Sequence, residues 1–449
     1  MAGTQAIDGD WTIDSLTTVP NSELRRVASP TGCAVIARTP DDASYFFGFH
    51  DISPWSADGR YLLMHRFDGE LAGLPDGSDE AEIVIWDRSS GEFRVVGRTT
   101  TWNLQQGARA MWLPGPGRQV AYNRLVDGGA GCEIVDIDSG ARRTFGTTIG
   151  AVSPDGRYAL TPSYGRLARY WKAYGYQALP PPPGLDAPGP AEDGIWRLDL
   201  ATGEHRLIVP ISELPRGDAR DGAGEPYRFV THLSFNPAGT RIVFYDRSIT
   251  RDGALYSRFL SATPEGTGLR VIADEKVSHF CWLDEKTLLV WMRRSLLPIT
   301  RIRSAGLLSN PLVKPLLAFV RSLKGRFKSS MLRESFYELD VDGAAAPHPF
   351  EPALFSQDGH PMLSPDGRYI VIDAYPDGRG RIPLAIYDRL ARRRVDIADF
   401  QHGVVVTDSD LKCDFHPRWN RDGTQICGDV CTMGRRSVVI LDVRPALAP

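Results

Sequence analysis

One short motif recurs along the chain and restricts its fold more than any other feature. The motif places an Asp-Gly type turn between two segments rich in β-branched and aromatic residues, which is typical of a β-hairpin. Its five clear copies are WSADGRYLLMH (55–65), VSPDGRYAL (152–160), FNPAGTRIVFY (235–245), LSPDGRYIVID (363–373) and WNRDGTQICGD (419–429). Two degenerate copies fill the gaps: WLPGPGRQVAYN (112–123) and WLDEKTLLVW (282–291). Seven such units, most of them followed by a third apolar segment, predict a repeat fold.

Four-stranded units that repeat around an axis form a β-propeller. We therefore predict an all-β, seven-bladed β-propeller over residues 33–449, preceded by an N-terminal extension at residues 1–32. Residues 33–38 (CAVIAR) are predicted to supply a closing strand to the last blade.

Composition narrows the class of protein. Of the 449 residues, 24% are charged and 42% are hydrophobic, and the net charge is −3. This balance, without a recognisable binding motif, argues against a nucleic-acid partner. The N-terminus lacks the basic region and apolar run of a signal peptide, and no run of about 18 apolar residues occurs. The six cysteines are scattered, as expected of free thiols in a reducing compartment. We predict a cytoplasmic protein.

Histidines recur at one topological position. In a propeller, the residues just before each innermost strand surround one mouth of the central channel. Histidines at such positions can simply bond loop backbones. Neutral imidazoles that converge with a carboxylate instead suit a divalent metal such as Mn²⁺ or Zn²⁺. The residues at this position are His50, His232, His279, His360 and His416, and Asp414 stands two residues before the last histidine.

Loops that open on the same face are rich in arginine and tyrosine. Arginines around a metal favour a bidentate anionic ligand, such as a carboxylate or a sulfate. A solvated loop surface is the alternative for each residue taken alone. The residues expected at this mouth are Tyr164, Arg166, Arg169, Arg247, Tyr375, Arg379 and Arg381.

A basic segment interrupts blade 5. From Trp291 through Arg333 the chain has ten Lys or Arg residues and no Asp or Glu. One helical face there carries Leu316, Leu317, Val320 and Leu323. We therefore predict a basic, helical insertion at about residues 292–334. Three roles are open for this insertion: a lid or dimerisation element, a helix lying on an anionic membrane surface, or a capping helix with a solvated basic side.

Four segments of the later blades resemble the oligogalacturonate lyases, a family of cytoplasmic, seven-bladed propellers related to the TolB-type repeats. The segments are THLSFNPAGTRIVF, SHFCWLDEKTLLVW, DGHPMLSPDGRYIVID and CDFHPRWNRDGTQICGD. The resemblance implies β-elimination on short uronate chains and a Mn²⁺-type ion held by three histidines and a glutamine. By position, His279 and His416 match metal ligands. Asp414 falls where the family has a further histidine, and Leu411 stands near the family's glutamine. His232 and His360 match histidines close to the family's site.

We therefore predict a metal-dependent lyase that cleaves an acidic, uronate-containing oligo- or polysaccharide by β-elimination. Removal of the proton beside a carboxylate needs a base, and the carboxylate must be neutralised as the enolate forms. The predicted roles are metal binding by His279, His360, Asp414 and His416; proton abstraction by His232, with Tyr164 or Arg166 behind it; and substrate binding by His50, Arg169, Arg247, Tyr375, Arg379 and Arg381. Metal-assisted hydrolysis at the same site is a related variant.

A non-catalytic propeller is the alternative hypothesis. It would bind an acidic glycan or a protein partner. The segments YFFGFHDISPWS and TWNLQQGARAMW look like signatures of bacterial propellers that are associated with polysaccharide gene clusters. A place in bacterial polysaccharide metabolism is thus common to both hypotheses.

Overall fold

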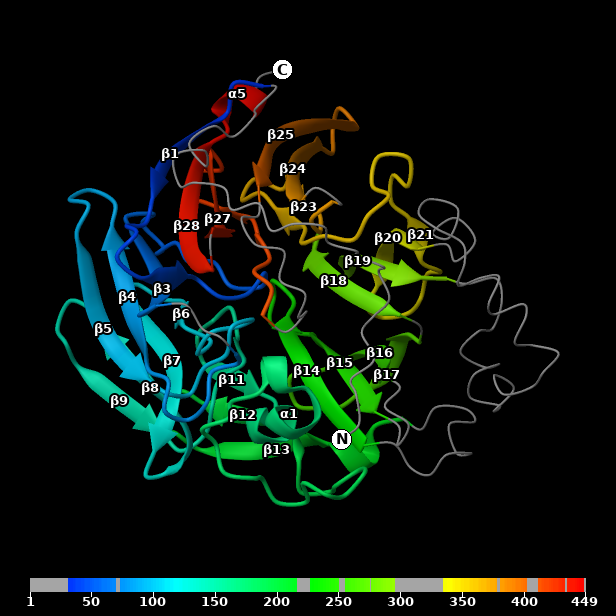
Figure 1. Cartoon of the computed structure of the whole chain (residues 1–449). Helices are drawn as coiled ribbons and strands as arrows, with labels where there is room; N and C mark the ends of the chain where they lie inside the picture. Colours follow the sequence, from blue (N-terminus) through cyan, green and yellow to red (C-terminus); the bar gives the residue numbers. More distant parts are fainter. Residues whose placement is uncertain are drawn as a thin grey trace.

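The computed structural model describes residues 31–69, 73–215, 227–249, 255–274, 276–294, 334–377, 380–401, 411–432 and 434–447. Seven four-stranded antiparallel sheets are arranged radially around a central axis (Figure 1). The prediction of an all-β, seven-bladed β-propeller is confirmed.

The blades are numbered in chain order, and each is given from its innermost strand outward. Blade 1 contains β2 (Ser44–Phe46), β3 (Tyr61–Phe67), β4 (Ala81–Asp87) and β5 (Phe93–Thr99). Blade 2 contains β6 (Met111–Trp112), β7 (Gln119–Val126), β8 (Gly129–Asp136) and β9 (Arg142–Phe145). Blade 3 contains β10 (Ala151–Val152), β11 (Tyr158–Thr161), β12 (Gly194–Asp199) and β13 (His205–Pro210). Blade 4 contains β14 (Tyr227–Phe235), β15 (Ile242–Ile249), β16 (Leu255–Ala262) and β17 (Arg270–Ala273).

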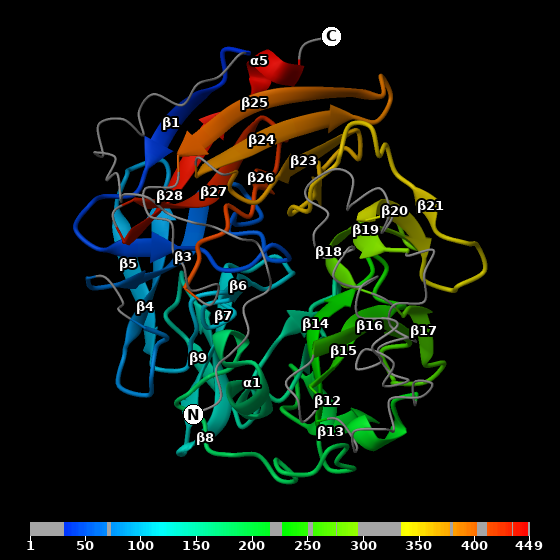
Figure 2. The same ribbon diagram turned by 45° about the vertical axis from the view of Figure 1, so that its right-hand side comes forward.

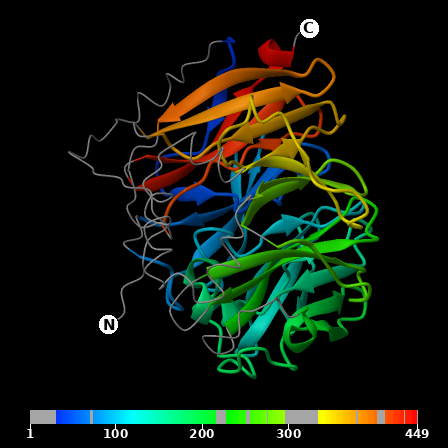
Figure 3. The same ribbon diagram turned by 90° about the vertical axis from the view of Figure 1, so that its right-hand side faces the viewer.

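The remaining three blades complete the ring. Blade 5 contains β18 (Val277–Trp282), β19 (Thr287–Arg293), β20 (Glu334–Asp340) and β21 (His348–Pro349). Blade 6 contains β22 (Met362–Leu363), β23 (Tyr369–Asp373), β24 (Arg381–Asp388) and β25 (Arg393–Gln401). Blade 7 contains β26 (Arg418–Trp419), β27 (Gln425–Thr432), β28 (Arg435–Asp442) and β1 (Ala34–Arg38). In the two turned views, blades 6 and 7 lie at one end of the molecule and blade 3 lies at the other (Figures 2 and 3).

Strand β1 closes the ring. It pairs antiparallel with β28, with Ala34 opposite Asp442 and Arg38 opposite Val439. This pairing confirms the prediction that residues near the N-terminus supply a strand to the last blade. It covers the edge of β28 and joins the N-terminal part of the described chain to the last blade, which holds the ring closed.

The recurring turn has one hydrogen-bonding scheme. In blade 1 the Ser56 hydroxyl donates to Asp58 at 2.6 Å, and the same hydroxyl accepts from the backbone N–H of Tyr61 at 2.9 Å. Blades 3 and 6 repeat these contacts at the equivalent positions of VSPDGRY and LSPDGRY. The glycine of each turn adopts a left-handed φ near +70°, which other residues rarely accept. This φ is +71° at Gly59 and +70° at Gly423.

The hydrophobic core lies between neighbouring blades, where the apolar faces of two sheets meet. Tyr245 and Phe259 of blade 4 pack on Phe280 and Leu288 of blade 5, and the rings of Phe259 and Phe280 are 5.0 Å apart between centroids. The same arrangement recurs between the other blades, and it gives the inner strands a rigid base.

Three excursions fill or border the channel. Residues 47–54 interrupt the inner strand of blade 1, which resumes at the bridge between Trp55 and Leu62. Residues 100–110 precede β6 in blade 2. Between β11 and β12 of blade 3 lie the helix α1 (Tyr164–Tyr170) and the 3-10 turn η1 (Lys172–Tyr174), which sit beside β14 toward the centre of the ring (Figure 1). Two further short helical elements are η2 (Ile211–Glu213) and α5 (Arg444–Leu447).

Two predictions fall outside the described residues. The N-terminal extension at residues 1–32 is described only at 31 and 32, and the basic insertion only at its ends, because residues 295–333 are not described. The helix expected there, and its contact with a membrane or a second copy, stay predictions. Among the described residues, no helix has both the length and the apolar character that crossing a membrane requires.

Candidate metal centre

The five predicted histidines come together at the channel. His360 and His416 precede the inner strands β22 and β26, as expected. His232 and His279 lie inside β14 and β18, at register shifts between Thr231 and Ser234 and between Val277 and Phe280. Such bulges re-aim a side chain that would otherwise follow the strand's alternation. Left-handed backbone at His232 (φ +56°) and His416 (φ +49°) turns these two rings further.

His50 reaches the cluster by a different route. It lies in the excursion of blade 1, and its ring centroid is 5.5 Å from His279, 5.7 Å from His360 and 6.0 Å from His416. The neighbouring Asp51 anchors this excursion through two bonds from Arg109, at 2.8 and 2.9 Å. Both ring nitrogens of His50 are buried without a hydrogen-bond partner. The predicted role of His50 in substrate binding stays a prediction.

Three side chains of the cluster have the geometry of a metal site. Nitrogen atoms of His360 and His416 and a carboxylate oxygen of Asp414 all lie within 4.8 Å of one another. The Nε2 atoms of both histidines are 4.0 Å from Asp414 Oδ2. All three side chains are at least nine-tenths buried. We call this group the triad.

Hydrogen bonds fix the two histidines with the correct nitrogen facing inward. His360 Nδ1 donates to Asp373, at 2.9 Å from each carboxylate oxygen, and His416 Nδ1 donates to the carbonyl oxygen of Gly48 at 3.1 Å. Each Nε2 therefore keeps its lone pair. His360 Nε2 is buried and has no hydrogen-bond partner. A carboxylate or carbonyl behind a ligand histidine is the usual support of a metal ligand, so the residues present fit a divalent ion.

The electrostatics of the triad also suit a cation. Burial lowers the pKa of His360 and of His416 well below the usual range, so both rings are neutral near pH 7. Burial alone would raise the pKa of Asp414, but nearby positive charge, first of all that of Lys412, outweighs burial and lowers that pKa. Lys412 Nζ lies 3.4 Å from Asp414. Two neutral imidazoles and one carboxylate are thus available as donors.

His279 lies beside the triad and not within it. Its ring is 4.1 Å from that of His360 between centroids. Its Nδ1 bonds Asp358 at 2.9 Å, and its Nε2 is 3.4 Å from the hydroxyl of Tyr375. The predicted role of His279 as a fourth ligand stays a prediction, and so does substrate binding by Tyr375.

Asp358 and Asp373 are absent from the predicted set. Asp358 does carry a signal in the sequence, because Asp358-Gly-His360 repeats the Asp-x-His spacing of Asp414-Phe-His416. Asp373 ends β23, at a position where the repeat copy WNRDGTQICGD also ends in an aspartate, but only the folded blade shows that it bonds His360.

The opposite side of the cluster is aromatic and cationic. The ring of His232 lies 5.9 Å from Trp171 and 5.4 Å from Tyr174, both of blade 3. Burial, and then the charge of Arg247, lower the pKa of His232 well below the usual range. Arg247 packs on Trp171 with 4.1 Å between its guanidinium carbon and the ring centroid. Nothing in the sequence distinguishes Trp171 from a tryptophan of the hydrophobic core, so it was not predicted as a site residue.

Two of the predicted catalytic residues are buried and bonded or stacked within blade 3. Arg166 is 1% exposed, and its guanidinium donates to the backbone carbonyls of Arg228, Gly184, Leu185, Ala187 and Pro188. It therefore anchors the proline-rich excursion of blade 3. Tyr164 is buried in a stack on Tyr176, with 4.2 Å between ring centroids.

The remaining predicted arginines differ in their surroundings. Arg169 is exposed in the last turn of α1. Arg381 is half exposed and forms an ion pair with Asp377 at 2.8 Å. Arg379 lies outside the described residues.

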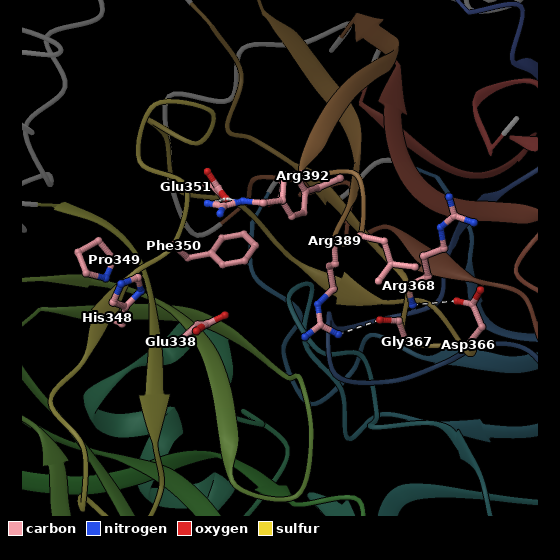
Figure 4. Close-up of a pocket in the computed structure, with 12 residues that line it drawn as sticks. Glu338, His348, Pro349, Phe350, Glu351, Asp366, Gly367, Arg368, Arg389 and Arg392 are labelled. Atoms are coloured by element: carbon pink, nitrogen blue, oxygen red, sulfur yellow. Dashed lines mark hydrogen bonds and ion pairs between the residues drawn. The ribbon is translucent and has the colours of Figure 1, made fainter. Parts of the chain in front are cut away.

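A cavity of about 570 Å³ lies between blades 5 and 6 (Figure 4), and none of the five clustered histidines lines it. Its cations are already neutralised or bonded. Arg392 pairs with Glu351 at 2.6 Å, Arg368 pairs with Asp388 at 2.7 Å, and Arg389 donates to the carbonyl of Gly367 at 2.8 Å. Two of the three arginines that line this cavity therefore already have a carboxylate partner.

Comparisons with known proteins agree with the fold. The chain matches no protein-family model, and no curated protein sequence matches it. Among solved structures, an oligogalacturonate lyase in complex with manganese aligns with a TM-score of 0.60 at 14% identity, over 93% of this chain and 95% of that one. The oligogalacturonate lyase of Vibrio parahaemolyticus aligns with a TM-score of 0.56 at 12% identity, over 91% of this chain and 93% of that one. The predicted resemblance is thereby confirmed for the fold.

Proposed function

We propose that the chain is a metal-dependent lyase that cleaves an acidic, uronate-containing oligo- or polysaccharide by β-elimination in the cytoplasm. The observation that carries this proposal is the triad, in which His360 and His416 present Nε2 toward the carboxylate of Asp414. The likeness in fold to an oligogalacturonate lyase solved with manganese supports it.

His360, Asp414 and His416 would hold the ion, and His279 is the proposed fourth ligand. Two or three imidazoles with one carboxylate suit Mn²⁺, which we propose as the metal. When bound, the ion supplies positive charge that stabilises the carboxylate of the substrate as an enolate. Asp373 and Gly48 hold the two histidines in the tautomer that this role requires.

The chain's own residues would carry the proton. His232 is neutral and partly exposed at the mouth, so its ring can accept the proton from the carbon beside the carboxylate. The C–H electron pair then forms the double bond of the product as the glycosidic C–O bond breaks. The leaving oxygen keeps the electrons of that bond and takes up a proton from water. Arg247 would bind the substrate's carboxylate, and Tyr375, His50, Arg169, Arg379 and Arg381 are proposed as further substrate contacts.

A non-catalytic propeller that binds an acidic glycan is the second candidate. Leu411, which stands near the glutamine of the resembling family, packs against the apolar cluster that contains Trp102 and Leu104. A leucine there supplies no ligand, and Asp414 replaces a histidine, so the coordination set differs from the one that the resemblance implies.

Metal content is the first test. We expect about one ion per chain in protein purified without added metal, and loss of that ion in His416→Ala, as measured by mass spectrometry. Loaded wild-type protein should then generate the ultraviolet absorbance of an unsaturated uronate from one member of a panel of uronate oligomers. If neither protein holds or takes up any metal, the metal-dependent mechanism is wrong. If metal binds but uronates are only bound, the second candidate is correct.

A further inference from the structure

We propose that Trp171 and Tyr245 hold the guanidinium of Arg247 as a planar receptor for the carboxylate of an acidic sugar, on the His232 side of the triad. The inference deepens the proposed function and relies on it for the class of ligand. It assigns a role in specificity to the excursion of blade 3, which carries Trp171.

Arg247 is a buried cation without a counter-ion in the described chain. It is 9% exposed, and it forms no hydrogen bond or ion pair with a described residue. Its Nε is buried without a partner. Its neighbours in blade 4 behave differently, because Arg228 and Arg258 both pair with Asp246. A guanidinium left unpaired in this way is costly unless a ligand supplies the anion.

Two aromatic rings lie against this guanidinium. Its central carbon lies 4.1 Å from the ring centroid of Trp171 and 5.0 Å from that of Tyr245. Ring faces attract a cation but offer no hydrogen-bond acceptor in its plane. The donors at the edge of Arg247 therefore remain available for a bidentate partner, which a carboxylate matches in shape and charge.

Trp171 is itself held rigidly. Ser163 caps α1 by accepting a hydrogen bond from the backbone N–H of Arg166, and the backbone N–H of Trp171 donates to Leu167 at 2.7 Å. The ring of Tyr174 covers Trp171 at 4.0 Å between centroids. Blade 3 thus places a fixed indole against an arginine of blade 4, and Trp171 is a positioning residue.

The site next to Arg247 belongs to the histidine cluster. His232 contacts both Trp171 and Phe49, and Phe49 contacts His416 of the triad at 5.4 Å between centroids. A sugar whose carboxylate binds Arg247 would therefore lie over His232, the proposed base. We commit to a carboxylate, because the planar donor edge fits it and its charge is the one that β-elimination requires.

The test compares acidic sugars with their neutral esters. Trimers of galacturonate, mannuronate and guluronate, and the methyl ester of each, are titrated by calorimetry into manganese-loaded protein. The variants are Arg247→Met, Arg247→Lys, Trp171→Ala and Trp171→Phe. Arg88→Met is the matched control, because Arg88 packs on Trp86 at 4.2 Å in the same manner but on blade 1. Metal content and thermal unfolding are measured for every variant.

We expect wild-type protein to prefer at least one acid trimer to its ester by about tenfold or more, the value of a charge-assisted hydrogen bond. Arg247→Met should abolish this preference, and Arg247→Lys should keep only part of it. Trp171→Ala should reduce the preference about three- to tenfold, as expected of a lost cation–π contact. Trp171→Phe should largely keep the preference of wild type. Arg88→Met should bind as wild type does.

The inference is overturned if no acid trimer is preferred, if Arg247→Met keeps the preference, or if Trp171→Ala keeps it while remaining folded. A different result would contradict the proposed lyase activity and leave this inference intact. An acid preference that depends on Arg247, without metal binding or without an unsaturated product, would remove the lyase and leave the carboxylate receptor in place.

Discussion

The carboxylate of Asp373 bonds both the backbone and the ring of His360. The carboxylate accepts from the backbone N–H of His360 at 2.6 Å and from Nδ1 at 2.9 Å, and it accepts from the backbone N–H of His416 at 3.2 Å. Burial raises the pKa of Asp373 to about 6. One carboxylate at the end of β23 thus orients a histidine of blade 6 and fixes the backbone at a histidine of blade 7.

Replacement of Asp373 tests this arrangement. Asp373→Asn cannot stabilise the Nδ1-protonated tautomer of His360 with a charge, so we expect the affinity for Mn²⁺ to fall about 10- to 100-fold. Competition with a chelator measures this affinity. Asp399→Asn, a half-buried residue of the same blade, is the control. Equal affinities in Asp373→Asn and wild type would show that Asp373 does not support a ligand.

Asp414 can be replaced by histidine, the residue that the oligogalacturonate lyases have at this position. Asp414→His supplies a third imidazole at the same place, so we expect it to retain about one metal ion per chain. Asp414→Ala removes a donor and leaves Lys412 without its carboxylate, so we expect at least a tenfold loss of affinity. Metal analysis after dialysis distinguishes the two. Retention of the ion by Asp414→Ala would exclude Asp414 as a ligand.

The fold was predictable because each blade repeats one local pattern. The Ser-x-Asp-Gly turn makes its own hydrogen bonds within six residues, so a single sequence shows it. The convergence of the histidines followed from the fold alone, since equivalent positions of a propeller meet at one axis. Closure by residues 33–38 followed from the same logic, because a strand was left over before blade 1.

The partners of the site residues were not predictable in the same way. Arg166 and Arg247 were both expected in arginine-rich loops. Arg166 instead lies in α1, where five carbonyls sequester its guanidinium, and Arg247 lies in β15 and packs on Trp171. Nothing local in the sequence separates them, because the contacts join residues of different blades. Asp373 is a similar case, since its partner His416 is 43 residues away.

Arg166 should matter for stability. Arg166→Met removes a buried cation that bonds several carbonyls of the blade 3 excursion, so we expect unfolding to become easier by at least about 3 kcal/mol. Metal content should be unchanged, because the triad lies on other blades. Urea unfolding and metal analysis provide the two measurements. A variant of normal stability would mean that the carbonyls are satisfied without Arg166.

The turn glycines offer a matched pair of substitutions. Gly59 and Gly156 share a φ of +71°, so an alanine at either costs about 1–2 kcal/mol of backbone strain. A Cβ at Gly59 meets nothing within 4 Å, whereas one at Gly156 meets the carbonyl oxygen of Pro114 at 3.0 Å. We expect Gly156→Ala to be the more destabilising in urea unfolding. The reverse order would mean that the two turns differ in ways other than this contact.

Asp429 should make stability depend on pH. It is 1% exposed, its Oδ1 accepts from the backbone N–H of Phe47 at 3.2 Å, and its Oδ2 has no partner. Burial raises its pKa well above the usual range. The folded state therefore holds this proton more tightly than the unfolded state, whose carboxyl titrates near pH 3.9. The stability that Asp429 contributes is complete below that pH and is lost as the pH rises through the folded-state pKa.

Asp429→Asn removes this titration while it keeps an acceptor for Phe47. In metal-free protein we expect the variant to gain about 1–3 kcal/mol over wild type at pH 8, the typical penalty of an unsatisfied buried polar group. The gain should be smaller at pH 5, where the wild-type carboxyl is more fully protonated. Urea unfolding at the two pH values measures the difference, with Asp399→Asn as the control. A difference between variant and wild type that does not change with pH would show that the carboxyl of Asp429 titrates alike in the folded and unfolded states.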